Sequence, residues 1–184
     1  MQLRSHQLDS LVAMQQSDKG QIIVPTGGGK TMCMIEDAKY RFNNTRKTIV
    51  VVAPRILLAN QLSADFLEHI TNVNVLHVHS GETHHTSTTK PEEIKTFCIY
   101  PLHLHTIIFT TYHSLHRIQE ADIDVDTIYF DEAHNSVQRN FIEAVEYYSM
   151  YAKRSYFFTA TPKHSRTPKK IGMNDTFIFG DVIC

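Results

Sequence analysis

The sequence contains few cysteines, and their spacing does not match the pairs used by metal sites or disulfide frameworks. Only Cys33, Cys98 and Cys184 are present, and no two of them form a C-x-x-C pair. An odd number without such spacing argues against a zinc ribbon and against a set of disulfides. This cysteine usage is typical of a protein that folds in a reducing, intracellular compartment.

Long apolar segments are also missing. No uncharged apolar run approaches the roughly 18 residues that are needed to cross a bilayer. Residues 1–10 are polar and lack the apolar segment of a secretory signal peptide. We therefore expect no membrane partner and a location in the cytoplasm, or inside a host cell.

The sequence has no excess of either charge. It contains 18 Lys and Arg against 19 Asp and Glu, which gives a net charge of −1. A protein that coats nucleic acid through its overall charge would be basic, so any nucleic-acid contact must use a local patch. Because 42% of the 184 residues are hydrophobic, the chain can build the core of one globular domain, and a disordered segment is excluded.

Short apolar runs alternate with stretches of helical periodicity. Unbroken runs typical of strands buried on both faces of a parallel sheet occur at residues 21–24, 48–53, 73–78, 106–110, 127–130 and 155–159. Between them lie two one-sided apolar stripes, Leu58, Leu62, Phe66 and Ile70, and then Val137, Phe141, Val145 and Tyr148. A further helix is expected over residues 7–14. This alternation predicts a doubly wound α/β fold with a mostly parallel sheet and helices on both faces.

Two segments do not fit the alternation. Residues 79–90 are rich in Thr, Ser and His and indicate an exposed loop. Residues 176–184 turn apolar again, and we interpret them as one more strand or as the lead into a further region.

A glycine-rich segment, Pro-Thr-Gly-Gly-Gly-Lys-Thr at residues 25–31, follows the first expected strand and opens a helix. Successive glycines let backbone N–H groups approach phosphate oxygens, and the helix N-terminus adds positive charge. We expect Lys30 to neutralise the β- and γ-phosphates of a nucleotide and the Thr31 hydroxyl to bind magnesium. Val24 departs from the simplest form of this motif, which has glycine there, and a glycine-rich loop without a ligand is the alternative. The expected phosphate-binding residues are Thr26, Gly27, Gly28, Gly29, Lys30 and Thr31.

A pair of carboxylates, Asp131 and Glu132, follows the expected strand at residues 127–130. Ligands of open α/β sheets bind at this carboxyl edge. Two adjacent carboxylates need a compensating cation, so we expect Asp131 to hold magnesium and Glu132 to orient and deprotonate the attacking water. The alternative is a surface loop or a helix cap. A phosphate-binding loop upstream favours the catalytic interpretation.

Together these segments resemble the superfamily 2 helicases and translocases. Six sequence elements of the family occur here in the same order as in the family. They are an upstream glutamine element at residues 4–7, motif I at 25–31, motif Ia at 53–55 with Leu58 and Gln61, motif Ib at 110–112, motif II (Asp-Glu-Ala-His) at 131–134 and motif III (Thr-Ala-Thr-Pro) at 159–162. The resemblance implies a RecA-like domain that spans residues 1–184 and binds ATP and Mg²⁺. It implies an ATPase motor that unwinds or moves along nucleic acid.

The resemblance also implies individual roles. Gln7 would contact adenine. Pro54, Arg55, Thr110 and Thr111 would meet the nucleic-acid backbone, for which hydroxyls and N–H groups suffice. His134, Thr159 and Thr161 would couple the nucleotide state to that groove. The Thr-Ala-Thr-Pro form of motif III beside Asp-Glu-Ala-His is more similar to DNA translocases, repair helicases and restriction-enzyme motors than to RNA helicases, so DNA is favoured.

Motors of this family have two RecA-like domains with ATP in the cleft between them, and the second supplies arginine fingers. We expect the second domain to come from downstream sequence or from another chain, and we expect the present chain alone to hydrolyse ATP poorly. Three alternatives stay open: an ATP-responsive nucleic-acid clamp without turnover, an RNA helicase domain and an unrelated P-loop kinase.

Histidine is abundant, with 12 residues. His77 and His79 would share one face of a strand, because side chains alternate along a strand. A zinc site is conceivable, but no H-E-x-x-H or C-x-x-C spacing supports it, and we interpret these histidines as solvent-facing residues of loops and strand ends.

Overall fold

The computed structural model describes residues 2–25, 29–43, 45–100, 104–162, 164–165 and 170–184. Its centre is a seven-stranded sheet with the order β1-β7-β6-β2-β5-β3-β4, and every neighbouring pair in it is parallel. The strands are β1 (Lys19–Ile23), β2 (Thr48–Ala53), β3 (Val73–Val78), β4 (Thr86–Ser87), β5 (His105–Thr111), β6 (Thr127–Phe130) and β7 (Arg154–Thr159). The predicted parallel α/β sheet is confirmed.

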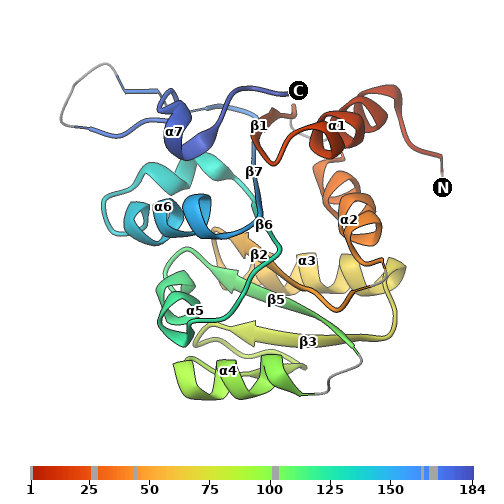
Figure 1. The fold of residues 1–184 in the computed structure, drawn as a ribbon, viewed down its shortest axis with the longest axis vertical. Helices are drawn as coiled ribbons and strands as arrows, with labels where there is room; N and C mark the ends of the chain where they lie inside the picture. Colours follow the sequence, from red (N-terminus) through yellow and green to blue (C-terminus); the bar gives the residue numbers. More distant parts are fainter. Residues whose placement is uncertain (1, 26–28, 44, 101–103, 163, 166–169) are drawn as a thin grey trace.

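Helices cover both faces of this sheet (Figure 1). One face packs against α1 (Ser5–Gln16), α2 (Lys30–Arg41) and α3 (Ile56–His69). The other packs against α4 (Pro91–Ile99), α5 (Leu115–Ala121), α6 (Ile142–Tyr151) and α7 (Thr176–Phe179). A 3-10 turn, η1 (Ala133–Val137), follows β6.

Strand β2 shows why the apolar runs form central strands. Its residues alternate between the two cores: Ile49 and Val51 join the cluster beneath α2 and α3, whereas Val50 and Val52 join the cluster beneath α5 and α6. All four side chains are at most 1% exposed. A strand that is buried on both faces needs apolar residues at every position, which is the pattern of this run.

The structure differs from the expectations in three places. The stripe that begins at Val137 is not one helix, because η1 ends there and α6 begins at Ile142. The expected loop at residues 79–90 contains the two-residue strand β4. Residues 176–179 form the short helix α7 instead of a strand, and the Asp175 side chain caps it by accepting from the Phe177 N–H at 3.1 Å. A single parallel bridge then joins Val182 to Gln21 at the edge of β1.

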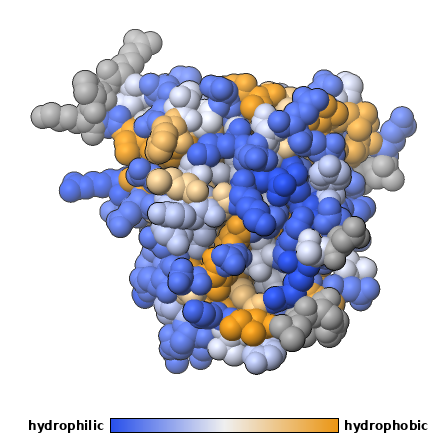
Figure 2. Space-filling view, in the orientation of Figure 1, coloured by the Kyte–Doolittle hydropathy of each residue, from blue (hydrophilic) through white to orange (hydrophobic). Residues whose placement is uncertain are grey.

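The surface carries no broad apolar face on the side drawn in Figure 2, where hydrophobic patches are separated by hydrophilic side chains. Among the described residues, no helix has the length and apolar character that crossing a membrane requires.

Candidate nucleotide and nucleic-acid site

The fold brings the glycine-rich segment and the acidic pair together at the carboxyl edge of the sheet. Lys30 is the first residue of α2, which follows β1, and the acidic pair follows β6. The Lys30 Nζ lies 2.9 Å from Asp131 Oδ1 and also donates to Glu132 Oε1. Strand β7 separates β1 from β6 in the sheet, so only the fold places these three residues in contact.

Burial and charge act against each other in this cluster. Burial by itself would lower the pKa of Lys30, but the carboxylates of Asp131 and Glu132 outweigh it and raise that pKa. Lys30 is therefore a stable cation. Burial raises the pKa of Asp131, which is only 4% exposed, although the Lys30 ammonium partly opposes this shift. Additional positive charge would favour the ionised form of Asp131.

The backbone is strained at the acidic pair. Glu132 has φ of 48°, in the left-handed region that side chains other than glycine rarely adopt. Three hydrogen bonds hold this conformation: the Glu132 N–H donates to Asp131 Oδ1 at 3.0 Å, Asn135 Nδ2 donates to the Glu132 carbonyl at 2.9 Å, and the Asp131 N–H donates to the Val52 carbonyl at 2.8 Å. Strain of this kind gathers at functional sites, where the surroundings must maintain it.

Gln7 lies against the end of the glycine-rich segment. Its Nε2 donates to the Gly29 carbonyl at 3.1 Å, and its Oε1 accepts from the Arg4 N–H at 2.8 Å. Gly29 has φ of 76°, a backbone conformation that favours glycine, and a Cβ there would displace the Gln7 amide. Thr26, Gly27 and Gly28 lie outside the described residues.

The residues expected to couple the nucleotide to the groove also converge. His134 Nδ1 lies 2.9 Å from Thr159 Oγ1 and 3.6 Å from Glu132 Oε2. Thr159 Oγ1 in turn accepts from the Thr161 N–H at 3.1 Å. The turn after β6 is thereby linked to the turn after β7.

Three of the four residues expected to meet nucleic acid line a separate pocket of about 300 Å³ at the same edge of the sheet. Pro54, Arg55 and Thr111 contribute to it, as do Ile56, His79, Ser80, His113 and Ser114. Thr110 does not fit the expectation. It is fully buried, and its hydroxyl donates to the Val78 carbonyl at 2.7 Å, so its side chain is already engaged inside the sheet.

Tyr112 is a site residue that the sequence did not single out. Its hydroxyl donates to the Asp131 carbonyl at 2.7 Å, although the residue belongs to the segment expected to meet nucleic acid. Burial raises the pKa of this phenol well above its usual value, so it stays a donor. The position of Tyr112 within motif Ib was visible in the sequence, but its long-range partner was not.

The interpretation of His77 and His79 as solvent-facing is wrong, because they are 0% and 3% exposed. They do share one face, and His77 Nδ1 lies 3.1 Å from His79 Nε2. His77 Nε2 lies 3.0 Å from the Ser63 hydroxyl, and the Gly81 N–H donates to His79 Nδ1 at 3.2 Å. Within the described residues no group of three or more His, Cys, Asp or Glu could hold a metal ion.

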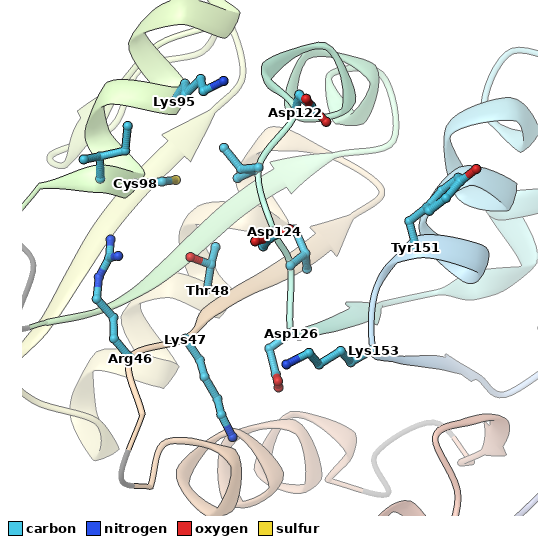
Figure 3. A pocket seen from close by; sticks show the side chains of 13 residues that line it. Arg46, Lys47, Thr48, Lys95, Cys98, Asp122, Asp124, Asp126, Tyr151 and Lys153 are labelled. Atoms are coloured by element: carbon cyan, nitrogen blue, oxygen red, sulfur yellow. The ribbon is translucent and has the colours of Figure 1, made fainter.

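A second pocket, of about 530 Å³, lies at the opposite, amino-terminal edge of the sheet (Figure 3). Its charged lining combines both signs, with Arg46, Lys47, Lys95, Lys153, Asp122, Asp124 and Asp126. None of the sequence-predicted site residues lines it.

The donor set at the carboxyl edge fits magnesium. Thr31 offers a hydroxyl in the first turn of α2, and Asp131 offers a buried carboxylate that Lys30 only partly neutralises. Hard oxygen donors of this kind bind Mg²⁺ together with phosphate oxygens and water. The residues present therefore fit a shared nucleotide and magnesium site.

A parallel sheet with a glycine-rich segment and an acidic pair at its carboxyl edge defines the class of RecA-like domains. Solved structures confirm the fold. The UvsW helicase from bacteriophage T4 matches with a TM-score of 0.70 at 15% identity, over 99% of this chain and 60% of that one. A nuclease-deletion mutant of the Type ISP restriction-modification enzyme LlaGI, solved with a DNA substrate mimic, matches with a TM-score of 0.75 at 22% identity, over 100% of this chain and 20% of that one.

Sequence comparison gives the family. The profile described as "Type III restriction enzyme, res subunit" (ResIII) matches residues 1–164. The chain belongs to the ResIII family, and the resemblance to superfamily 2 helicases is confirmed. The ATP-dependent helicase SGS1 of Saccharomyces cerevisiae is 33% identical over 72 residues, which are 39% of this chain and 5% of SGS1. The chain thus spans only a small part of SGS1 and LlaGI.

Proposed function

We propose that this chain is the ATP- and magnesium-binding half of a motor that unwinds or moves along DNA. The observation that carries the proposal is the contact of Lys30 with both Asp131 and Glu132, because it joins a phosphate-binding loop to an acidic pair at one edge of a RecA-like sheet. A second RecA-like domain, from further sequence or from another chain, would complete the site with arginine fingers.

Each residue of the cluster has a distinct role in this proposal. Lys30 binds the β- and γ-phosphates, which displaces its ammonium from the two carboxylates. Thr31 and Asp131 hold Mg²⁺, which supplies positive charge to the phosphate oxygens when bound. Glu132 then accepts a proton from the attacking water, and its strained backbone fixes the direction of its carboxylate. Gln7 selects adenine beside Gly29.

The nucleic-acid part of the proposal rests on the pocket that Pro54, Arg55 and Thr111 line. The Arg55 side chain supplies positive charge there, and Thr111 supplies a hydroxyl, which suits contacts to phosphate without base recognition. DNA is favoured by the Thr-Ala-Thr-Pro form of residues 159–162. The LlaGI relative was solved with a DNA substrate mimic, which is consistent with this choice.

The proposal is tested by steady-state ATP hydrolysis with Mg²⁺ in four conditions: without nucleic acid, with single-stranded DNA, with duplex DNA and with RNA. Both this chain and a version joined to a second RecA-like domain are measured. We expect the joined version to be stimulated by DNA and the chain alone to be slow. Glu132→Gln should abolish hydrolysis and retain ATP binding, whereas the control Glu68→Gln, exposed on α3, should change neither.

The outcomes separate the alternatives. Stimulation by RNA above DNA would keep the motor and replace its substrate. Equal rates in all four conditions would contradict a nucleic-acid motor. Rapid phosphate transfer to small acceptors would point to a kinase.

A further inference from the structure

Tyr112 joins the two halves of the site. It follows Thr111 at the carboxyl end of β5, next to the pocket expected to bind nucleic acid. Its side chain is 2% exposed and reaches across the end of β2, where its hydroxyl donates to the Asp131 carbonyl at 2.7 Å. Asp131, which we propose holds magnesium, and Tyr112, which lies next to the nucleic-acid pocket, are therefore joined by a direct hydrogen bond.

The rest of Tyr112 is held firmly. Its backbone N–H donates to the Ala53 carbonyl at 3.3 Å, immediately before Pro54 and Arg55. Its ring stacks on Phe130 and Phe141 with centroid distances of 6.2 and 5.7 Å. The Tyr112 backbone is thus tied to the end of β2, and its side chain cannot move without disturbing the core around β6.

We propose that Tyr112 is a positioning residue that couples the nucleic-acid pocket to the nucleotide site through the hydrogen bond from its hydroxyl to the Asp131 carbonyl. The inference rests on the proposed function. The coupling through Tyr112 adds to the proposed function a route between the two sites, which is separate from the contact of His134 with Thr159.

The physical reason is the cost of breaking a buried hydrogen bond. The Asp131 carbonyl lies in the core, so a displacement of β5 that withdrew the hydroxyl would leave this oxygen without its partner. The backbones at Thr111 and at Asp131 therefore move together. When contacts with nucleic-acid phosphates shift the end of β5, the Asp131 carboxylate shifts with it.

The hydroxyl, and not the ring, carries this coupling. Tyr112→Phe keeps the stacking on Phe130 and Phe141 and removes the hydroxyl, which donates to the Asp131 carbonyl and also accepts from the Ser136 hydroxyl at 3.5 Å. Tyr148→Phe is the matched control, because Tyr148 is also 2% exposed and belongs to the same core, but lies on α6 and does not line the pocket of Pro54, Arg55 and Thr111. A role in packing alone would make the two variants behave alike.

The test measures the affinity of a fluorescent ATP analogue with Mg²⁺, without and with saturating single-stranded DNA. We expect DNA to change this affinity by about fivefold or more in the wild type and in Tyr148→Phe, which is the size of ordinary allosteric coupling. In Tyr112→Phe we expect less than half of that factor to remain. DNA titrations with and without the analogue must give the same factor, because binding linkage is reciprocal.

Several outcomes are distinguishable. If the wild type binds neither the analogue nor DNA, the proposed function fails and the inference fails with it. If the wild type binds both independently, or if Tyr112→Phe keeps the full factor, the inference alone is overturned. Urea unfolding of both variants establishes that they are folded. A Tyr112→Phe protein that is less stable but fully coupled would show that the hydrogen bond is only structural.

Discussion

The buried histidine pair makes a quantitative prediction about stability and pH. The Gly81 N–H donates to His79 Nδ1, so neutral His79 must carry its proton on Nε2 and donate it to His77 Nδ1. His77 then carries its proton on Nε2 and donates to the Ser63 hydroxyl. A further proton on either ring would set two N–H groups against each other. The chain of hydrogen bonds is therefore complete only while both rings are neutral.

The pKa values agree with this assignment. Burial first, and then the nearby His79 and His85, lower the pKa of His77 from 6.5 to about 3. Burial also lowers the pKa of His79. A group whose pKa is lower in the folded state stabilises the fold above its unfolded pKa and loses that contribution as the pH falls toward its folded pKa. His77 should thus destabilise the protein progressively below pH 6.5.

The magnitude follows from the shift. At pH 5, which is about 1.5 pH units below the unfolded pKa of 6.5, protonation of His77 stabilises the unfolded chain but not the folded protein. Each pH unit corresponds to about 1.36 kcal/mol, so the free energy of unfolding falls by roughly 2 kcal/mol. His77→Gln removes the titration and still offers one donor and one acceptor. Urea unfolding at pH 8, 7, 6 and 5 should show the wild type losing about 2 kcal/mol more than His77→Gln. Parallel curves for the two proteins would refute the buried, neutral His77.

Two further predictions concern the glycine-rich segment and the thiols. Gly29→Ala must place a Cβ in the left-handed region and against Gln7, so we expect ATP affinity to fall at least tenfold, measured by titration of a fluorescent ATP analogue. Unchanged affinity would contradict the backbone conformation of Gly29 and its contact with Gln7. Burial raises the pKa of Cys33 and of Cys98 to about 11, so at pH 8 about one thiol in a thousand is ionised at each. Ellman's reagent should therefore find one fast thiol, that of Cys184, which is only partly buried, and Cys184→Ser should remove it. Cys98 lines the pocket in Figure 3, but its thiol is buried. A rapid reaction of Ellman's reagent with Cys98 would contradict this burial.

The central strands could be predicted because burial on both faces leaves a continuous apolar run. The strands at residues 48–53, 73–78 and 127–130 match β2, β3 and β6 in full. Strand β4 escaped prediction because it has only two residues, both exposed and polar. Helix α7 was not predicted, because the consecutive apolar residues Phe177, Ile178 and Phe179 indicated one more strand or the lead into a further region. The cap at Asp175 was the overlooked indication of a helix.

The placement of Lys30 beside Asp131 and Glu132 could be predicted, because these residues belong to contiguous motifs at the ends of strands. Contacts between distant segments could not be. Thr110 and Thr111 are neighbours in one motif, yet strand alternation sends the Thr110 hydroxyl to the Val78 carbonyl. Likewise, the lack of a metal-site spacing led us to interpret His77 as solvent-facing, whereas β5 and α3 cover it with Phe109 and Ser63.

The central claim is that Lys30 and the acidic pair form a nucleotide and magnesium site. Its most direct test is the affinity of a fluorescent ATP analogue for the wild type and for Lys30→Ala, each with Mg²⁺ and with EDTA. We predict Mg²⁺-dependent binding in the wild type and a loss of at least tenfold in Lys30→Ala, while Lys39→Ala, exposed at the other end of α2, binds like the wild type. Equal affinity in wild type and Lys30→Ala, or binding that EDTA does not weaken, would contradict the account.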